Sequence, residues 1–380
     1  MAKRRAFGEG TIYRRPDGRW SAQLRLHDGT RKTYYGRSQR EVRDKLADAK
    51  AALAEGVHVG GRSQPLAKFL ARWLESIQPS VRASTFVSYE LNALRLTVHI
   101  GRVHLAQLSP EHIQAAYGRL LASGLSARSV QQAHAVLHRA LHNAVGWRLI
   151  IRNPCDFVSP PRPRRDEMKT LSPEELQRLF DATREERLFA LWVLLGTAGL
   201  RLGEALGLKW EDVDLGLGRL VIKRSIQSQR GGGKVFVEPK TSKSRRTVHL
   251  ADIAIEALAE HRRRQNLWRL AAEHWNDQGL VYPNLTGGPM EAGIANKQLT
   301  KALERASLPR IRVHDLRHTA ASVLFAAGAH PKVVQELLGH STITLTLDTY
   351  SHVIPAMHGD AARRLNELFR TSAASDASSA

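Results

Sequence analysis

One short segment in the last third of the chain is the most informative, and it reads His314-Asp315-Leu316-Arg317-His318. His314 and Arg317 stand three positions apart, so on a helix their side chains share one face. Four further frames accompany this segment in a fixed order. They are Gly199-Leu200-Arg201-Leu202-Gly203-Glu204, Pro239-Lys240-Thr241, Leu338-Gly339-His340-Ser341 and Leu347-Asp348-Thr349-Tyr350-Ser351-His352. Together the five frames predict a site that acts on a phosphodiester.

Each residue type in these frames meets a need of phosphodiester chemistry. Two arginines can grip phosphate oxygens with permanently charged forks and stabilise the transition state without a metal. A tyrosine can act as a covalent nucleophile, a lysine can protonate the departing sugar oxygen, and histidines can move protons or hydrogen-bond the phosphate. Glu204 follows Arg201 by three positions and could orient its guanidinium. The set therefore favours attack on a phosphodiester by a phenol oxygen.

The ordered frames resemble the tyrosine recombinases, also called the phage integrase family. The family pattern is Arg, Lys, His-x-x-Arg, His or Trp, and Tyr, with an acidic residue three positions after the first Arg, and each position is filled here. The resemblance covers roughly residues 65–365. It implies that four residues bind and activate the phosphate, namely Arg201, His314, Arg317 and His340. It also implies a general acid at Lys240, a 3′-phosphotyrosyl link at Tyr350 and acidic support from Glu204.

Some of these residues have simpler interpretations. Lys240 opens the basic run Lys-Thr-Ser-Lys-Ser-Arg-Arg, and such a run is usually a solvated face. Lys243, in the same run, could be the general acid instead. His318 is expected to pack or cap, and His340 could only complement the dipole of a helix C-terminus.

Residues 326–339 also allow a different hypothesis. They have the pattern of a helix, a glycine turn and a second helix, in which Pro331 suits the first helical turn and Gly339 a C-terminal cap. A second helix of this kind can enter a major groove, so the chain could be a non-catalytic helix-turn-helix regulator. That hypothesis leaves Tyr350, Arg201 and the His-x-x-Arg pair unexplained.

The composition agrees with a DNA partner. The chain of 380 residues has 57 Lys and Arg against 36 Asp and Glu, which gives a net charge of +21 and a pI of about 10.7. Such an excess supports phosphate contacts and salt-dependent affinity. The single cysteine, Cys155, excludes an internal disulfide and a cysteine-based zinc site, and it fits a reducing cytosol.

Leader, membrane and nucleotide signals are absent from the sequence. No apolar run follows the basic N-terminus Met-Ala-Lys-Arg-Arg, and no stretch approaches the length and apolarity of a membrane helix. No P-loop or glycine-rich dinucleotide turn occurs, so we expect no nucleotide cofactor. Because two arginine forks can stabilise the transition state, we expect no metal either. The expected location is the cytoplasm, in association with the nucleoid.

Residues 1–60 are expected to form a separate arm-type DNA-binding domain. Three strands are predicted at Thr11–Arg14, Arg19–Leu26 and Arg31–Tyr35, and a helix capped by Ser38 is predicted at Gln39–Glu55. This unit resembles the N-terminal arm-binding domain of phage-type integrases.

The second of these strands has two different faces. Trp20, Ala22, Leu24 and Leu26 alternate with Arg19, Ser21, Gln23 and Arg25. The apolar set should pack on the helix. The outer set could contact a major groove through Arg19, Gln23 and Arg25, although arginine-rich faces are often only solubilising.

Residues 64–157 are expected to form an all-helical domain in the position of the family's core-binding domain. The predicted helices are Leu66–Ile77, Ala83–Val98, Pro110–Ala122 and Ala127–Ala144. Residues 158–170, which are rich in proline and arginine, are expected to be a linker.

Residues 171–368 are expected to form a mainly helical catalytic domain with a small antiparallel sheet, beginning with the helix start Leu171-Ser172-Pro173-Glu174-Glu175. Strands are predicted at Arg219–Arg224, Val235–Glu238 and Thr247–Leu250, which places Lys240 on a connection between strands. Residues 371–380, rich in Ala and Ser, are expected to be disordered. The predicted fold class is multidomain α+β.

The sequence therefore predicts a site-specific DNA recombinase, an integrase that joins double-stranded attachment sites to integrate and excise a prophage or integrative element. By resemblance, a homotetramer would act on two duplexes through a Holliday junction, with an excisionase and a host DNA-bending protein as further partners. A transposon recombinase and a type IB topoisomerase-like enzyme are alternatives with the same chemistry.

Overall fold

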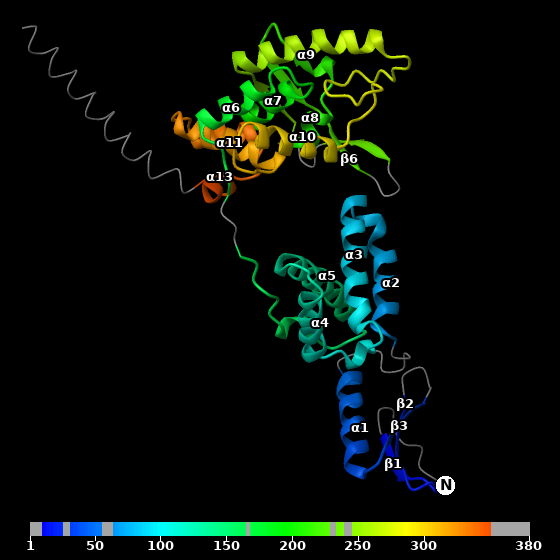
Figure 1. The fold of residues 1–380 in the computed structure, drawn as a ribbon. Helices are drawn as coiled ribbons and strands as arrows, with labels where there is room; N and C mark the ends of the chain where they lie inside the picture. Colours follow the sequence, from blue (N-terminus) through cyan, green and yellow to red (C-terminus); the bar gives the residue numbers. More distant parts are fainter. Residues whose placement is uncertain are drawn as a thin grey trace, which may run out of the picture. The chain divides into compact units, whose positions relative to one another are not determined.

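The computed structural model of the protein describes residues 10–25, 31–54, 64–164, 168–228, 233–238 and 245–350 (Figure 1). Contacts divide the chain into two compact units, Met1–Arg165 and Asp166–Ala380. Within the first unit, the N-terminal sheet and the following helices have separate apolar cores. Mostly helical structure with small antiparallel sheets confirms the predicted fold class.

The N-terminal region is a three-stranded antiparallel sheet backed by one helix. Its strands are β1 (Gly10–Arg14), β2 (Trp20–Arg25) and β3 (Arg31–Gly36), paired in that order, and α1 spans Gln39–Ala54. As the alternation in β2 predicts, the core joins one sheet face to α1 through Ala22, Leu24, Val42, Leu46 and Ala49. The Ser38 hydroxyl accepts the backbone N–H of Glu41 at 3.1 Å, which fixes the first turn of α1.

The outer face of this sheet differs from the predicted one at Ser21. Ser21 pairs with Tyr13 on one side and Tyr35 on the other, and it is 0% exposed. The two large rings flank the small side chain, so tyrosines form much of this face. Gln23 lies on the same face and donates from Nε2 to the Tyr13 hydroxyl at 3.1 Å.

The helical region of the first unit has four main helices, α2 (Leu66–Ile77), α3 (Ala83–Ile100), α4 (Pro110–Ala122) and α5 (Ala127–Gly146). Two match the predicted bounds, and α3 and α5 each continue two residues further. Ser109 and Ser126 cap α4 and α5 by accepting backbone N–H groups three residues ahead. Val158, the first residue of the predicted linker, is buried in this core.

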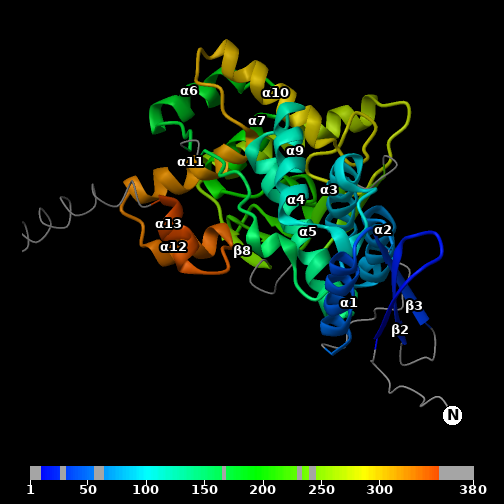
Figure 2. The same cartoon turned by 90° about the horizontal axis from the view of Figure 1, so that it is seen from below.

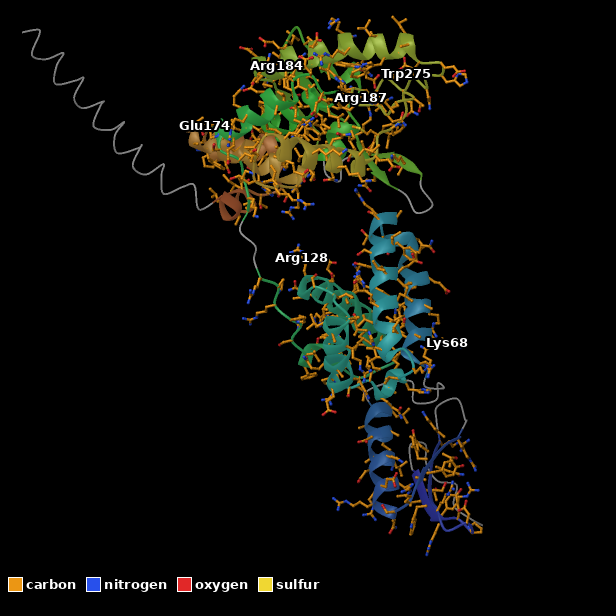
Figure 3. The ribbon with its side chains drawn as sticks, in the orientation of Figure 1. Lys68, Arg128, Glu174, Arg184, Arg187 and Trp275 are labelled. Carbon is orange, nitrogen blue, oxygen red and sulfur yellow. The ribbon has the colours of Figure 1, made fainter. Side chains whose placement is uncertain are left out.

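The second unit is built around a helix that is apolar on all sides. α7 (Phe189–Ala198) has seven consecutive buried residues, 190–196, and it contacts α6 (Pro173–Thr183), α9 (Asp252–Ala271) and α11 (Val313–Ala326). A helix of this composition must be enclosed by others. Arg187, labelled in Figure 3, fastens the start of α7 by donating from Nη2 to the carbonyls of Pro283 and Asn284 at 3.0 and 2.7 Å.

The strands of this unit are arranged differently from the prediction. β4 (Val213–Asp214), β5 (Arg219–Ile222) and β8 (Arg246–His249) form one antiparallel sheet, while β6 (Ser225–Ser228) and β7 (Lys234–Val237) form a separate hairpin. The predicted strand therefore stops at Ile222. The reason is that the next two residues, Lys223 and Arg224, both pair with the buried carboxylate of Asp212.

Within the residues described, no helix is both long enough and apolar enough to cross a membrane.

Candidate active site

Arg201 stands where α7 gives way to α8 (Leu202–Leu206). α7 ends at Gly199, whose φ of +61° suits glycine, and a Cβ there would come within 2.6 Å of the Leu338 side chain. Arg201 caps α8 instead of belonging to it. Its backbone N–H donates to Glu204 Oε2 at 3.0 Å, and its Nη1 donates to Glu204 Oε1 at 2.7 Å. Glu204 therefore holds both the backbone and the guanidinium of Arg201.

Arg317 comes from the first half of α11 and is 2% exposed. Its Nη1 donates to the Gly199 carbonyl at 2.6 Å, and its Nη2 donates to the Leu338 carbonyl at 2.6 Å. The buried guanidinium therefore joins the end of α7 to the end of α12 (Pro331–Leu338). Short bonds from a charged donor are strong, so this side chain also has a structural role.

His314 lies one turn before Arg317 on α11 and is exposed. Its ring packs edge-on against that of His318, with centroids 5.1 Å apart. Although the residue as a whole is exposed, partial desolvation of its ring, followed by the charge of Arg317, lowers the pKa of His314. His318 packs as predicted, and burial together with His314 lowers its pKa to about 4.

His340 follows the cap of α12. Gly339 has a φ of +62° and ends the helix, and the chain then turns into α13 (Ile343–Tyr350) (Figure 2). His340 is 9% exposed, and its Nδ1 lies 2.9 Å from the Thr346 hydroxyl. Burial, then the charges of Arg317 and Arg201, lowers its pKa to about 4. The imidazole is therefore neutral at physiological pH and can hydrogen-bond a phosphate without carrying charge.

Three arginines converge on the end of α12, one for each of three successive carbonyls. Arg246 donates to Leu337 O at 2.7 Å, Arg317 to Leu338 O at 2.6 Å and Arg201 to Gly339 O at 3.3 Å. The last carbonyls of a helix lack partners within the helix and carry its negative dipole end. Segments more than a hundred residues apart in the chain thus meet beside His340.

The local sequence pattern did not predict a role for Arg246. It is the first residue of β8, and its Nη2 lies 3.0 Å from Glu204 Oε2. In the sequence it looks like the end of the solvated run that begins at Lys240. A usable signal was the two-residue period of the strand, since Arg246 falls on the same face as Val248, which is 1% exposed.

Glu204 is the acidic centre of this cluster and is 5% exposed. Burial alone would raise the pKa of its carboxyl. The charge and hydrogen bonds of Arg246, and then those of Arg201, outweigh burial and lower the pKa below its usual value. One carboxylate therefore holds two guanidiniums.

The structure brings together some predicted site residues and does not describe others. Hydrogen bonds unite Arg201, Glu204 and Arg317 with the turn that bears His340. Tyr350 is the last residue of α13, and its side chain lies outside the described part of the chain. Lys240 and Lys243 fall in residues 239–244, also outside the described residues, as do residues 371–380.

The three predicted DNA contacts of the N-terminal sheet lie on or next to β2. Arg19 precedes the strand and is exposed, Arg25 ends it and is exposed, and Gln23 is half-buried. All three remain predictions.

Comparison with known proteins gives the same family that the ordered frames resemble. The phage integrase family model matches residues 169–357. A "Tyrosine recombinase XerC-like" protein of Caldanaerobacter subterraneus subsp. tengcongensis is 33% identical over 361 residues, which cover 89% of this chain and 92% of that protein. This chain belongs to the tyrosine recombinase family.

Further relatives of the recombinase include an integrase of Saccharopolyspora erythraea, 27% identical over 424 residues that cover 95% of this chain and 97% of the relative. Among solved structures, the Tn1549 transposon integrase in complex with a circular intermediate DNA has a TM-score of 0.66 at 21% identity, covering 76% of this chain and 95% of that one. The structural likeness shows a shared fold. As a tyrosine recombinase, the protein is an enzyme that cleaves and rejoins DNA strands at specific sites.

The hypothesis of a non-catalytic helix-turn-helix regulator is wrong, because the chain belongs to a family of enzymes. The two helices and the turn do form, but the second helix, α12, ends on the three arginines. This segment therefore forms part of the scaffold of the candidate site.

Proposed function

We propose that this recombinase integrates and excises a mobile element, either a prophage or an integrative element. The observation that carries the proposal is the convergence of Arg201, Arg317 and Arg246 on the turn before His340. Relatives named as integrases support it, among them the ICEBs1 integrase of Bacillus subtilis, which is 28% identical over 258 residues covering 66% of this chain and 68% of that protein.

In the proposed reaction the Tyr350 oxygen attacks a DNA phosphorus atom and forms a 3′-phosphotyrosyl bond. The bond to the 5′ oxygen breaks, and Lys240, or Lys243 in its place, gives that oxygen a proton. Arg201 and Arg317 stabilise the added negative charge, and the positive site needs little reorganisation because its guanidiniums are already fixed.

The second half of the reaction reverses the first on a new strand. The 5′ hydroxyl of the partner duplex attacks the phosphotyrosine, and the tyrosine oxygen leaves. Because the covalent link conserves the energy of the phosphodiester, the cycle needs no nucleotide cofactor. His314 and His340 would hydrogen-bond the phosphate in both halves, and Glu204 would support Arg201.

The proposed partners are two double-stranded attachment sites held by four copies of the chain. A lambda integrase tetramer bound to a Holliday junction has a TM-score of 0.56 at 18% identity, covering 88% of this chain and 96% of that one. An excisionase and a host DNA-bending protein are proposed as accessory partners that set the direction. Action on chromosomal sites would place the enzyme at the nucleoid.

The proposed domain roles follow the order of the chain. Residues 1–60 would bind arm sites through Arg19, Gln23 and Arg25, residues 64–157 would bind the core site, and residues 171–368 would cut it. The linker at 158–170 would join the last two.

A nicked suicide substrate containing the core site tests the proposal. Cleavage releases a short fragment that cannot religate, so a covalent adduct with the wild-type protein is expected and none with Tyr350→Phe. A plasmid pair carrying both attachment sites then separates the candidate activities. Recombinant plasmids support an integrase, whereas relaxation of supercoils without recombinants would indicate a topoisomerase-like enzyme.

A further inference from the structure

Arg246 occupies an unusual place for an arginine at the start of a strand. Its side chain is 7% exposed and runs under Gly339, where a Cβ would come within 3.0 Å of Nη1. Such deep burial of a guanidinium is costly unless its charge and its N–H groups are matched. The residue therefore has a specific task in the interior.

The acceptors of Arg246 belong to two different parts of the proposed site. Toward α8, Nη2 and Nη1 lie 3.0 and 3.4 Å from the two carboxylate oxygens of Glu204. Toward α12, Nε donates to the Leu337 carbonyl at 2.7 Å. Glu204 in turn holds Arg201, and Leu337 stands three residues before His340.

This geometry couples Arg201 and His340, which would touch the DNA phosphate, to Arg246, which would not. If Arg246 were absent, Glu204 would keep its ion pair with Arg201 but lose the one with Arg246. The end of α12 would also lose one of the three arginine hydrogen bonds described there. Both the guanidinium of Arg201 and the ring of His340 could then shift. Displacement of a reacting group by about 1 Å can slow a reaction about 100-fold.

We infer that Arg246 is a positioning residue for DNA cleavage, which sets Arg201 through Glu204 and His340 through the end of α12. The inference rests on the proposed roles of Arg201 and His340. This role distinguishes Arg246 from its neighbour Arg245. The Arg245 side chain is 58% exposed, and its Nη2 lies 2.9 Å from Oε1 of the exposed Glu238.

Arg246 lies a few residues after Lys240 and Lys243 in the sequence. The test must therefore distinguish slowed cleavage caused by a displaced phosphate clamp from slowed cleavage caused by a displaced proton donor. A change at Arg246 could act through the proton donor instead of the phosphate clamp. A substrate whose leaving 5′ oxygen is replaced by sulfur separates the two, because a thiolate departs without protonation. That substrate rescues loss of the acid and does not rescue loss of the clamp.

The test compares Arg246→Met with Arg245→Met as the matched control in the full chain. For each variant we would measure affinity for the core site, single-turnover cleavage of the suicide substrate and cleavage of the sulfur substrate. For Arg246→Met we expect affinity within about threefold of wild type, cleavage slowed about 100-fold, and no rescue by sulfur. Arg245→Met should match wild type in all three.

A conservative variant adds a readout that a simple loss of packing would not give. Arg246→Lys keeps the charge but cannot reach Glu204 and Leu337 O together with a planar fork. We expect cleavage between that of wild type and Arg246→Met at unchanged affinity. If Arg246→Met does not fold, a folded Arg246→Lys with slowed cleavage supports the inference, and one with wild-type cleavage overturns it.

Three results would contradict the positioning role. They are wild-type cleavage by Arg246→Met, full rescue by the sulfur substrate, and loss of affinity in parallel with loss of cleavage. The wild-type protein and Tyr350→Phe are run beside these variants. If the wild type forms no adduct, or Tyr350→Phe forms one, the proposed function fails independently of Arg246.

Discussion

The two clamp arginines should differ in what their removal does to stability. Arg317 is 2% exposed and donates two short hydrogen bonds to the carbonyls of Gly199 and Leu338. Hydrogen bonds from charged groups contribute roughly 1.5–3 kcal/mol each, so Arg317→Ala should lower the free energy of unfolding by about 3–6 kcal/mol. That is a large part of the roughly 5–15 kcal/mol that stabilises a typical domain.

Arg201→Ala should cost much less. The Arg201 side chain is 40% exposed, and Glu204 keeps its ion pair with Arg246 when Arg201 is removed. We expect a loss of about 1–2 kcal/mol at most. Cleavage should nevertheless fall about 100-fold or more in both variants, because in the proposed reaction each arginine stabilises the developing negative charge.

Urea denaturation of the full chain, with hydrogen exchange of residues 313–338 as a local probe, measures the difference. The reasoning is refuted if Arg317→Ala is within 1 kcal/mol of Arg201→Ala, or if exchange in α11 and α12 is unchanged by loss of Arg317. Arg245→Ala serves as a surface control and should leave both measurements at their wild-type values, since its pair with Glu238 is exposed.

Three more predictions follow from the site and its surroundings. Tyr350→Phe should bind the core site normally and form no covalent adduct on a nicked substrate, because only one oxygen is lost; an adduct would mean another nucleophile. Lys240→Ala should be rescued by the sulfur substrate while Lys243→Ala cleaves the ordinary substrate well, and the reverse pattern would move the acid to Lys243. Burial is the largest cause of the lowered pKa values of His261 and His340, which are both about 4 in the folded protein. The ordinary value in the unfolded chain is 6.5. Between pH 4 and 6.5 the unfolded state therefore binds more protons than the folded state. The free energy of unfolding should therefore fall as the pH drops from 6.5 to 4, and denaturation curves of His261→Gln should show a shallower fall.

The helix starts could be predicted from the sequence because their causes are local. Ser109 and Ser172 each precede a proline and an acidic residue, and each accepts a backbone N–H three residues ahead in the structure. Gly339 ends α12 as predicted because its positive φ is costly for other residues. Such signals need no knowledge of the rest of the fold.

Features that depend on distant partners could not be predicted in this way. Asp212, which ends β5 by pairing with Lys223 and Arg224, stands more than ten residues away from them in the sequence. Ser21 looked like part of a polar outer face, but its burial depends on which tyrosines the neighbouring strands place beside it. Neither strand register nor ion-pair choice is encoded in a local pattern.

The site shows the same division. The order of Arg201, Glu204, His314, Arg317 and His340 indicated the chemistry, and the spacing of Arg201 and Glu204 anticipated their contact. The sequence did not indicate that the Arg317 side chain would be buried and would donate to two backbone carbonyls. That fact requires Gly199 and Leu338 to meet, which only the tertiary fold decides.

The charges at the end of α12 explain why this arrangement suits a phosphodiester. Three guanidiniums meet there, and the carboxylate of Glu204 contacts two of them. The other acceptors described are carbonyl oxygens, which carry partial and not full negative charge. Burial is the largest cause of the lowered pKa of His340, and Arg317 and Arg201 lower it further because they disfavour another positive charge beside them. A phosphate brings full negative charge to this excess of positive charge, and its transition state carries still more negative charge. The site is therefore matched most closely to the reacting form of its substrate.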